Sequence, residues 1–203
     1  MMQGSAEWYA ARCGKVTASR IYDVCAKTRN GYSAARATYM RELLVERLRG
    51  IAEEHFVTDA MQWGIDNEDL ARGVYEGRNG IPVGQVGFIP HPSIANTGAS
   101  PDGLVGDDGA IEIKCPNSGT HIDTILAGEI PERYQYQMAW QLECTGRKWC
   151  DFISYDPRLP GDASYFCRRF EPSAAFFDAI REEVIRFIAE LDALEAKIRE
   201  YKA

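Results

Sequence analysis

A tight turn at Gly106-Asp107-Asp108-Gly109 constrains the fold of this chain more than any other segment. Asp and Gly at such a turn, with alternating apolar residues beside it, are typical of a β-hairpin. The expected strands are residues 96–105, with a break at Pro101, and residues 110–115, which Pro116 ends. The chain must therefore contain a β-sheet, and the remaining pattern decides what covers it.

Much of the remaining chain carries apolar residues at helical spacing. Expected helices lie at 8–12, 33–48, 59–76, 121–127, 131–144 and 173–201, with a further helix start at Thr17-Ala18-Ser19. Further strands are expected at 83–89, 148–155 and 164–170. This order predicts an α/β (α+β) fold in which helices flank a mixed central β-sheet.

No repeat, low-complexity tract or linker divides the 203 residues. One domain is expected, with N-terminal helices over 1–80, a sheet region over 81–170 and a C-terminal helix over 172–202. Hydrophobic residues make up 45% and charged residues 26%, which argues against a disordered chain. No apolar run is long enough to span a membrane, and Met1–Tyr9 lacks the features of a secretory signal, so a cytoplasmic protein is expected.

Six cysteines are present, and none of them form a Cys-x-x-Cys pair. In a cytoplasmic chain of this length they are expected to be reduced, buried thiols. An iron–sulfur cluster on four cysteines is the alternative. It is disfavoured because only Cys144 and Cys150 are close in sequence.

The formal net charge of −7 argues mildly against a nucleic-acid partner, because binding to phosphates needs Lys and Arg. The charge is uneven, however, since residues 1–50 hold nine Lys or Arg and four Asp or Glu. A basic N-terminal part on an acidic body can bind DNA locally. The alternative is that these side chains form solvated helix faces, and charge alone does not decide between the two.

Two carboxylates and a lysine are expected to converge at the hairpin. Asp102 lies near the end of one strand, and Glu112 and Lys114 lie two residues apart on the next, so they face the same side. Mg²⁺ prefers oxygen ligands and retains waters, so one or two carboxylates suit it, and the backbone carbonyl of Ile113 offers another oxygen. A lysine beside the metal can position or help deprotonate an attacking water.

This arrangement indicates a metal-dependent nuclease, in which one or two metal ions stabilise the attacking and leaving oxygens of a phosphoryl displacement. The spacing alone is weak evidence, because an Asp followed by Glu-x-Lys occurs by chance in many chains. The alternative is an exposed edge strand whose Glu and Lys side chains are only solvated.

The chain also resembles the lambda exonuclease family of YqaJ-type viral recombinases. That family belongs to the PD-(D/E)xK nuclease superfamily, so the resemblance implies a restriction-endonuclease-like core. Six blocks carry the resemblance, in the family's order and at similar spacing. They are Glu7-Trp8 with Ala11–Ser19; Trp63-Gly64 with Glu68 and Ala71-Arg72; Ser100–Leu104; Glu112–Pro116; Gln137; and Tyr155–Arg158.

For the hydrolytic site, the resemblance implies that Asp102 and Glu112 bind the metal, with the backbone carbonyl of Ile113 as a further ligand. The implied metal is Mg²⁺, with Mn²⁺ as a substitute, at one or two ions per site. Lys114 would orient the nucleophilic water.

Two more residues match positions at this site in the family. Glu68 matches an acidic residue that contacts the metal through its water shell, and the alternative is an ordinary exposed helix Glu. Gln137 matches a glutamine that lines the site, with Gln135 and Gln141 as nearby alternatives. A buried, hydrogen-bonded core glutamine is the alternative role.

The resemblance also implies a pocket for the 5′-phosphate end of DNA at Arg12 and Ser19, with Ser100 as a helper. An arginine offers a charged fork, and a serine at a helix start adds its hydroxyl to free backbone N–H groups. Arg29 matches a residue that reaches the minor groove, and Met61 matches an apolar wedge that splits the terminal base pairs. Without the resemblance, Ser19 is a plain helix cap and Arg12 a surface charge.

The implied activity is 5′-to-3′ hydrolysis of one strand of linear duplex DNA to 5′-mononucleotides, which leaves a 3′ overhang for recombination by strand annealing. The family forms a trimeric ring around DNA. Its usual partner is a single-strand annealing protein, commonly in a phage or prophage of a bacterial host. One alternative is an endonuclease of the same superfamily, which would normally carry an added recognition element. The other is an inactive DNA-end-binding protein, against which Asp102, Glu112 and Lys114 argue.

Overall fold

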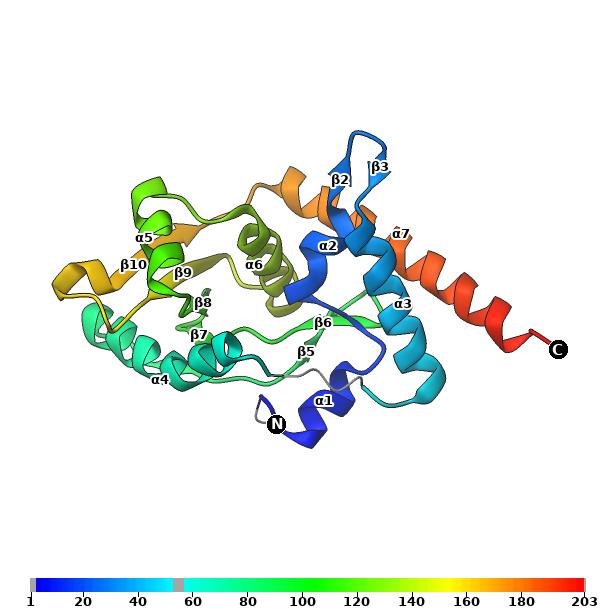
Figure 1. Ribbon diagram of the computed structural model, residues 1–203, viewed down its shortest axis with the longest axis horizontal. Coiled ribbons are helices and arrows are strands. Elements are labelled where there is room, and N and C mark those ends of the chain that lie inside the picture. Colours follow the sequence, from blue (N-terminus) through cyan, green and yellow to red (C-terminus); the bar gives the residue numbers. More distant parts are fainter. Residues whose placement is uncertain (1–2, 53–56, 203) are drawn as a thin grey trace.

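The computed structural model describes residues 3–52 and 57–202. At its centre is a five-stranded sheet in the order β10-β9-β8-β7-β4. Strands β7 to β10 are labelled in Figure 1. Strands β8 and β9 run parallel, and the other neighbouring pairs are antiparallel, so the expected mixed sheet is confirmed. The strand bounds are β4 Val83–Gly84, β7 Gly103–Val105, β8 Gly109–Lys114, β9 Trp149–Tyr155 and β10 Tyr165–Phe170.

Helices cover both faces of this sheet. On one face, α4 (Asp59–Asn79) packs Ala71 and Tyr75 against a cluster that includes Ile111 and Ile113 of β8. On the other face, α6 (Glu132–Thr145) contributes to a cluster with Ala110 of β8. A third helix, α5 (Ser118–Ala127), contacts β9. Because both faces of β8 are buried, the alternative of an exposed edge strand is wrong.

A second core lies among the helices beside the sheet. It joins α2 (Ile21–Cys25), α3 (Ala34–Arg49), α6 and the long α7 (Ala174–Arg199). The apolar stripe of α7 is buried from Ile180 to Leu191, while Leu194 and Ile198 at its end are exposed. Trp140 of α6 is fully buried there, and its indole N–H donates to the hydroxyl of Thr97 at 2.9 Å. Helix α6 therefore packs into both cores, which fixes its position against the sheet.

The expected strand at 96–105 is divided between two sheets. Its first part, β6 (Thr97–Ala99), pairs with β1 (Val16–Thr17) and β5 (Ile89–Pro90) in a separate three-stranded sheet. The second part is β7 of the central sheet. Pro101 lies at the crossing, where its missing N–H cannot continue a ladder. The segment 100–102 therefore connects the two sheets.

Two other expectations are wrong in detail. Residues 83–89 do not form one strand, because β4 and β5 at its two ends belong to different sheets. The helix expected from residue 17 begins as a 3₁₀ turn at Ala18–Arg20, with Thr17 at its N-cap position, so Ser19 is not the cap. Thr17 is also paired in β1, and its N–H donates to the hydroxyl of Tyr39 at 3.0 Å. These tertiary contacts override the local helix signal.

Further local features depart from the sequence pattern. A small hairpin of β2 (Lys27–Thr28) and β3 (Gly31–Tyr32), which the pattern did not predict, projects from the helical layer (Figure 1). The cysteines are free, but Cys167 is exposed, so the expectation that all are buried is wrong. Within residues 3–52 and 57–202, no helix is long and apolar enough to cross a membrane.

Close packing at the start of β7 yields a stability test. A Cβ atom at Gly103 would overlap the side chain of Val83 and come within 3.2 Å of Ile111. We expect Gly103→Ala to lower the free energy of unfolding by about 1–3 kcal/mol through overpacking. In urea titrations, the matched control Gly77→Ala, at an open helical position, should raise it by about 0.4–1 kcal/mol. Equal stability of the two variants would contradict this packing.

Candidate active site

The carboxylate of Asp102 is held at the edge of β8. Its Oδ2 accepts a hydrogen bond from the backbone N–H of Ile113 at 2.7 Å. Strand β7 pairs with β8 only as far as Ile111, opposite Gly103, so Asp102 takes the place of a strand partner beyond that point. The N–H and C=O of one strand residue point to the same edge. The carbonyl of Ile113 therefore faces the edge at which Asp102 lies.

The carboxylate of Glu112 is fully buried and held on both oxygens. Gln137 donates from Nε2 to Oε1 at 2.6 Å, and Gln141 donates from Nε2 to Oε2 at 2.6 Å. The Lys114 ammonium forms an ion pair with Oε1. A buried charge is tolerated only when it is paired and hydrogen-bonded, and these three donors meet that requirement.

The sequence pattern predicted a position at the site for one of these two glutamines and did not predict the contact of the other. Gln137 lies at Glu112 as expected, and Gln141, named only as an alternative to it, is a second donor. Gln135 points elsewhere and donates to the carbonyl of Ile130 at 2.8 Å. Positions four apart on a helix share a face, so the spacing of 137 and 141 is the signal that identifies both.

Three ionisable side chains, Asp102, Glu112 and Lys114, lie close together at this largely buried site. Burial raises the pKa of Asp102 well above its usual value, and the neighbouring Glu112 raises it further. Burial alone would lower the pKa of Lys114, but Glu112 and Asp102 raise it above its usual value. The raised pKa favours the ammonium form of Lys114, which pairs with Glu112. Such crowding of carboxylates is relieved by a nearby cation.

Glu68 of α4 completes the charged group. Its Oε1 accepts from Arg72 Nη2 at 2.6 Å, one helical turn away, and its side chain is 37% exposed. Burial raises the pKa of Glu68, while Arg72 and Lys114 lower it. The net effect is a raised pKa of Glu68, to which the charge of Glu112 also contributes, and the charge of Glu68 in turn raises the pKa of Asp102.

The donor set at this site suits a hard divalent cation. No three His, Cys, Asp or Glu side chains form a ready-made metal cluster among the described residues. Mg²⁺ retains several waters, however, and needs only one or two carboxylates. Asp102 Oδ1 accepts no hydrogen bond from the described part of the chain, and the Ile113 carbonyl lies on the same edge. Asp102, Glu112 and this carbonyl therefore fit the role of metal ligands.

Arg12 and Ser100 come together beside this site. Ser100 Oγ accepts from Arg12 Nη1 at 3.4 Å and from Trp8 Nε1 at 2.9 Å. The Arg12 guanidinium stacks 4.0 Å from the Trp8 ring centroid. It forms no ion pair with a carboxylate within the described ranges, although the charge of Glu46 acts on it. Burial lowers the pKa of Arg12. Ser19, expected in the same pocket, has its side-chain contact with Thr17, at 3.4 Å.

Arg29 and Met61 lie apart from these contacts. Arg29 is exposed in the turn between β2 and β3. Met61 lies in the first turn of α4, where its N–H donates to the hydroxyl of the N-cap Thr58 at 3.3 Å, and its side chain is 50% exposed. The structure gives neither residue a contact with the carboxylates, so both remain predictions for DNA contact.

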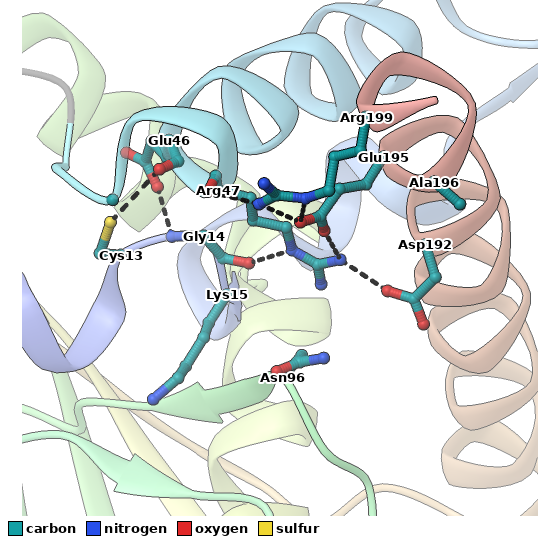
Figure 2. A pocket seen from close by; sticks show the side chains of 11 residues that line it. Cys13, Gly14, Lys15, Glu46, Arg47, Asn96, Asp192, Glu195, Ala196 and Arg199 are labelled. Carbon is teal, nitrogen blue, oxygen red and sulfur yellow. Dashed lines mark hydrogen bonds and ion pairs between the residues drawn. The ribbon is translucent and has the colours of Figure 1, made fainter. Parts of the chain in front are cut away.

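A cavity of about 730 Å³ lies between the segment after α1 (Ala6–Arg12), the end of α3 and the last turns of α7 (Figure 2). Arg47 crosses it, donating from Nε to Gly14 O at 2.8 Å and pairing through Nη1 with Asp192 at 2.5 Å and Glu195 at 3.3 Å (Figure 2). These charges pair with one another, and none of the carboxylates on the sheet lines the cavity. The candidate chemistry therefore lies at the sheet and not in this cavity.

Comparisons with known proteins agree with this architecture. Two crystal structures of LHK-Exo, an alkaline exonuclease from Laribacter hongkongensis, share 51% identity with this chain, and one of them is in complex with dAMP. In both, 96% of each chain is covered, at a TM-score of 0.91. A phage related exonuclease from Haemophilus somnus 129PT has 14% identity and a TM-score of 0.70, over 91% of this chain and 96% of that chain. At that identity it supports the fold alone.

The fold is thus the mixed α/β fold of these exonuclease structures. Residues 7–148 match the YqaJ-like viral recombinase domain, and the chain belongs to that family. No curated protein matches the chain.

The glutamine pair at Glu112 can be tested through stability. Gln141→Leu leaves Oε2 of a buried carboxylate without its donor, so we expect the free energy of unfolding in EDTA to fall by about 1.5–3 kcal/mol. Gln135→Leu instead removes a hydrogen bond between two uncharged groups, so the free energy of unfolding should fall by only about 0.5–1.5 kcal/mol. Urea titrations of both variants check the difference. A Gln141→Leu variant no less stable than Gln135→Leu would argue against this pairing.

Proposed function

We propose that this protein is a metal-dependent exonuclease that degrades the 5′-ended strand of linear double-stranded DNA. It releases 5′-mononucleotides and leaves a 3′ single-stranded overhang for recombination by strand annealing. The proposal rests on the family and on two neighbouring groups of residues. One group is Arg12 with Ser100, and the other is Asp102 with Glu112 and Lys114. The relative LHK-Exo is an exonuclease whose crystal structure with dAMP, a mononucleotide, supports the same type of product.

The observation that carries the proposal is the short stretch of chain that connects the Arg12–Ser100 pair to the carboxylates at Asp102 and Glu112. Ser100, which contacts Arg12, and Asp102, which lies beside Glu112, are separated only by Pro101. Two residues of chain span at most about 7 Å. A terminal phosphate bound at Arg12 and Ser100 would therefore lie close to the carboxylates. The first phosphodiester of the same strand would then be within reach of the hydrolytic residues. That geometry favours removal of one nucleotide at a time from a 5′ end.

Each residue has a defined part in the proposed reaction. Asp102, Glu112 and the Ile113 carbonyl would hold Mg²⁺ or Mn²⁺, which supplies charge stabilisation to the oxygens of an in-line phosphoryl displacement. Lys114 donates a hydrogen bond that orients the attacking water. Gln137 keeps the Glu112 carboxylate in place. Glu68, on helix α4, would contact the metal through the water molecules that surround it.

The remaining proposed contacts concern DNA outside the hydrolytic site. Arg29 would reach the minor groove from the tip of its hairpin, Met61 would wedge apart the terminal base pairs, and Ser19 would assist at the phosphate. A trimeric ring suits a chain with net charge −7, because encirclement replaces overall attraction to DNA. The proposed partner is a single-strand annealing protein in the cytoplasm of a bacterial host.

The activity and its polarity can be tested on one substrate. We expect loss of the phosphorylated strand from linear duplex DNA that carries a 5′-phosphate at one end and a 5′-hydroxyl at the other. With Mg²⁺ or Mn²⁺ the products are mononucleotides, EDTA stops the reaction, and a closed circle stays intact. Cutting of the circle would favour an endonuclease. Binding of DNA ends without cleavage would favour an inactive end-binding protein.

Lys114 is tested separately from DNA binding. Because its ammonium orients the attacking water, we expect Lys114→Ala to lower the turnover rate by about 10²–10³-fold. Binding of a 5′-phosphorylated duplex in EDTA should stay close to that of the wild type. The control Lys148→Ala removes a lysine whose side chain is 73% exposed and should leave both unchanged. Wild-type turnover by Lys114→Ala would exclude the assigned role.

A further inference from the structure

The hydroxyl of Ser100 has an unusual set of partners. A serine hydroxyl has one O–H donor and two acceptor lone pairs. Ser100 Oγ accepts from Trp8 Nε1 at 2.9 Å and from Arg12 Nη1 at 3.4 Å. Indole and guanidinium groups donate and do not accept. Both lone pairs are thus engaged, and the O–H of Ser100 cannot be donated to either neighbour.

The O–H of Ser100 is therefore a hydrogen-bond donor without an acceptor among the described residues. Ser100 donates no hydrogen bond to any residue that the structure describes. Arg12 likewise forms no ion pair there, although its side chain is half-buried and the charge of Glu46 acts on it. The two groups therefore present hydrogen-bond donors only, which is the chemistry that recognises an acceptor-only anion such as a terminal phosphate.

Trp8 contacts both groups through different parts of its ring. Its face carries the Arg12 guanidinium at 4.0 Å from the ring centroid, and its N–H binds Ser100. Tyr9 packs edge-on against the same ring, with centroids 4.9 Å apart. A cation over an indole face is attracted to the ring quadrupole, which restricts the guanidinium plane. Trp8 thus constrains both members of the pocket at once.

We propose that Trp8 is a positioning residue that makes Ser100 a fixed donor to the 5′-phosphate, and so sets the preference for phosphorylated ends. The inference rests on the proposed function, because it needs the phosphate pocket at Arg12 and Ser100. Without the indole N–H, the Ser100 hydroxyl rotates and donates less often toward the pocket. A 5′-hydroxyl end carries no anion there, so its binding does not depend on Trp8.

The test compares the affinity of short duplexes with a 5′-phosphate or a 5′-hydroxyl end, measured in EDTA so that no cleavage occurs. The readout is the ratio of the two dissociation constants. Trp8→Phe keeps the ring face and loses the N–H, so we expect this ratio to fall about three- to tenfold, the effect of one hydrogen bond. The dissociation constant for the 5′-hydroxyl duplex should not change. Tyr9→Phe, which removes a neighbouring polar group, is the matched control with an unchanged ratio.

Two further variants separate positioning from a structural effect. Trp8→His keeps a ring N–H, so the ratio of the two dissociation constants should fall less in this variant than in Trp8→Phe. Ser100→Ala should lower the ratio by itself, and adding Trp8→Phe to it should have no further effect, because residues that act through each other are not additive. Equal losses for Trp8→His and Trp8→Phe, or effects that multiply in the double variant, would overturn the inference.

The result also distinguishes this inference from the proposed function. If Arg12→Ala and Ser100→Ala lower the ratio and Trp8→Phe does not, the phosphate pocket stands and the role of Trp8 is wrong. If the wild-type protein binds both duplexes equally, the pocket itself is wrong, and the inference fails with it.

Discussion

The structure depends on the burial of one charge, the carboxylate of Glu112, in the middle strand of the central sheet. An uncompensated charge in such a place costs several kcal/mol. Lys114 comes from the same strand, but Gln137 and Gln141 come from α6, so that helix must pack at one fixed rotation. The apolar side chains of α6 pack into both cores and hold it there. The packing that holds α6 in place therefore also positions both glutamines at Glu112.

The segment 100–102 joins this buried site to a second, more open one. It leaves a three-stranded sheet, crosses at Pro101 and enters the central sheet at Gly103. Ser100 stays with Arg12, while Asp102 lies at the edge of β8. The short connection limits the distance between the proposed site for a terminal phosphate and the proposed site of hydrolysis. A flexible loop would not define which bond is reached.

The number of basic residues in the N-terminal part does not predict DNA binding, because several of them are already paired. Arg36 binds Glu190, Arg47 binds Asp192, and Lys27 binds Glu183, each connecting an N-terminal element to α7. These ion pairs hold helices together rather than present positive charge. Arg12 differs, since its guanidinium contacts Ser100 and the Trp8 ring and forms no ion pair with a carboxylate among the described residues. Local pairing, and not the number of cations, decides where an anion can bind.

The sequence by itself determined the mixed sheet, the hairpin at 106–109, most helix positions and the convergence of Asp102, Glu112 and Lys114. These follow from turn chemistry and side-chain periodicity, which act over a few residues. Only the tertiary structure decided that residues 96–105 belong to two sheets, that Gln141 binds Glu112, and that Trp8 contacts Ser100 and Arg12. Those contacts join residues far apart in the chain, and local preference carries no information about which distant partner a strand edge, an amide or an indole N–H will meet.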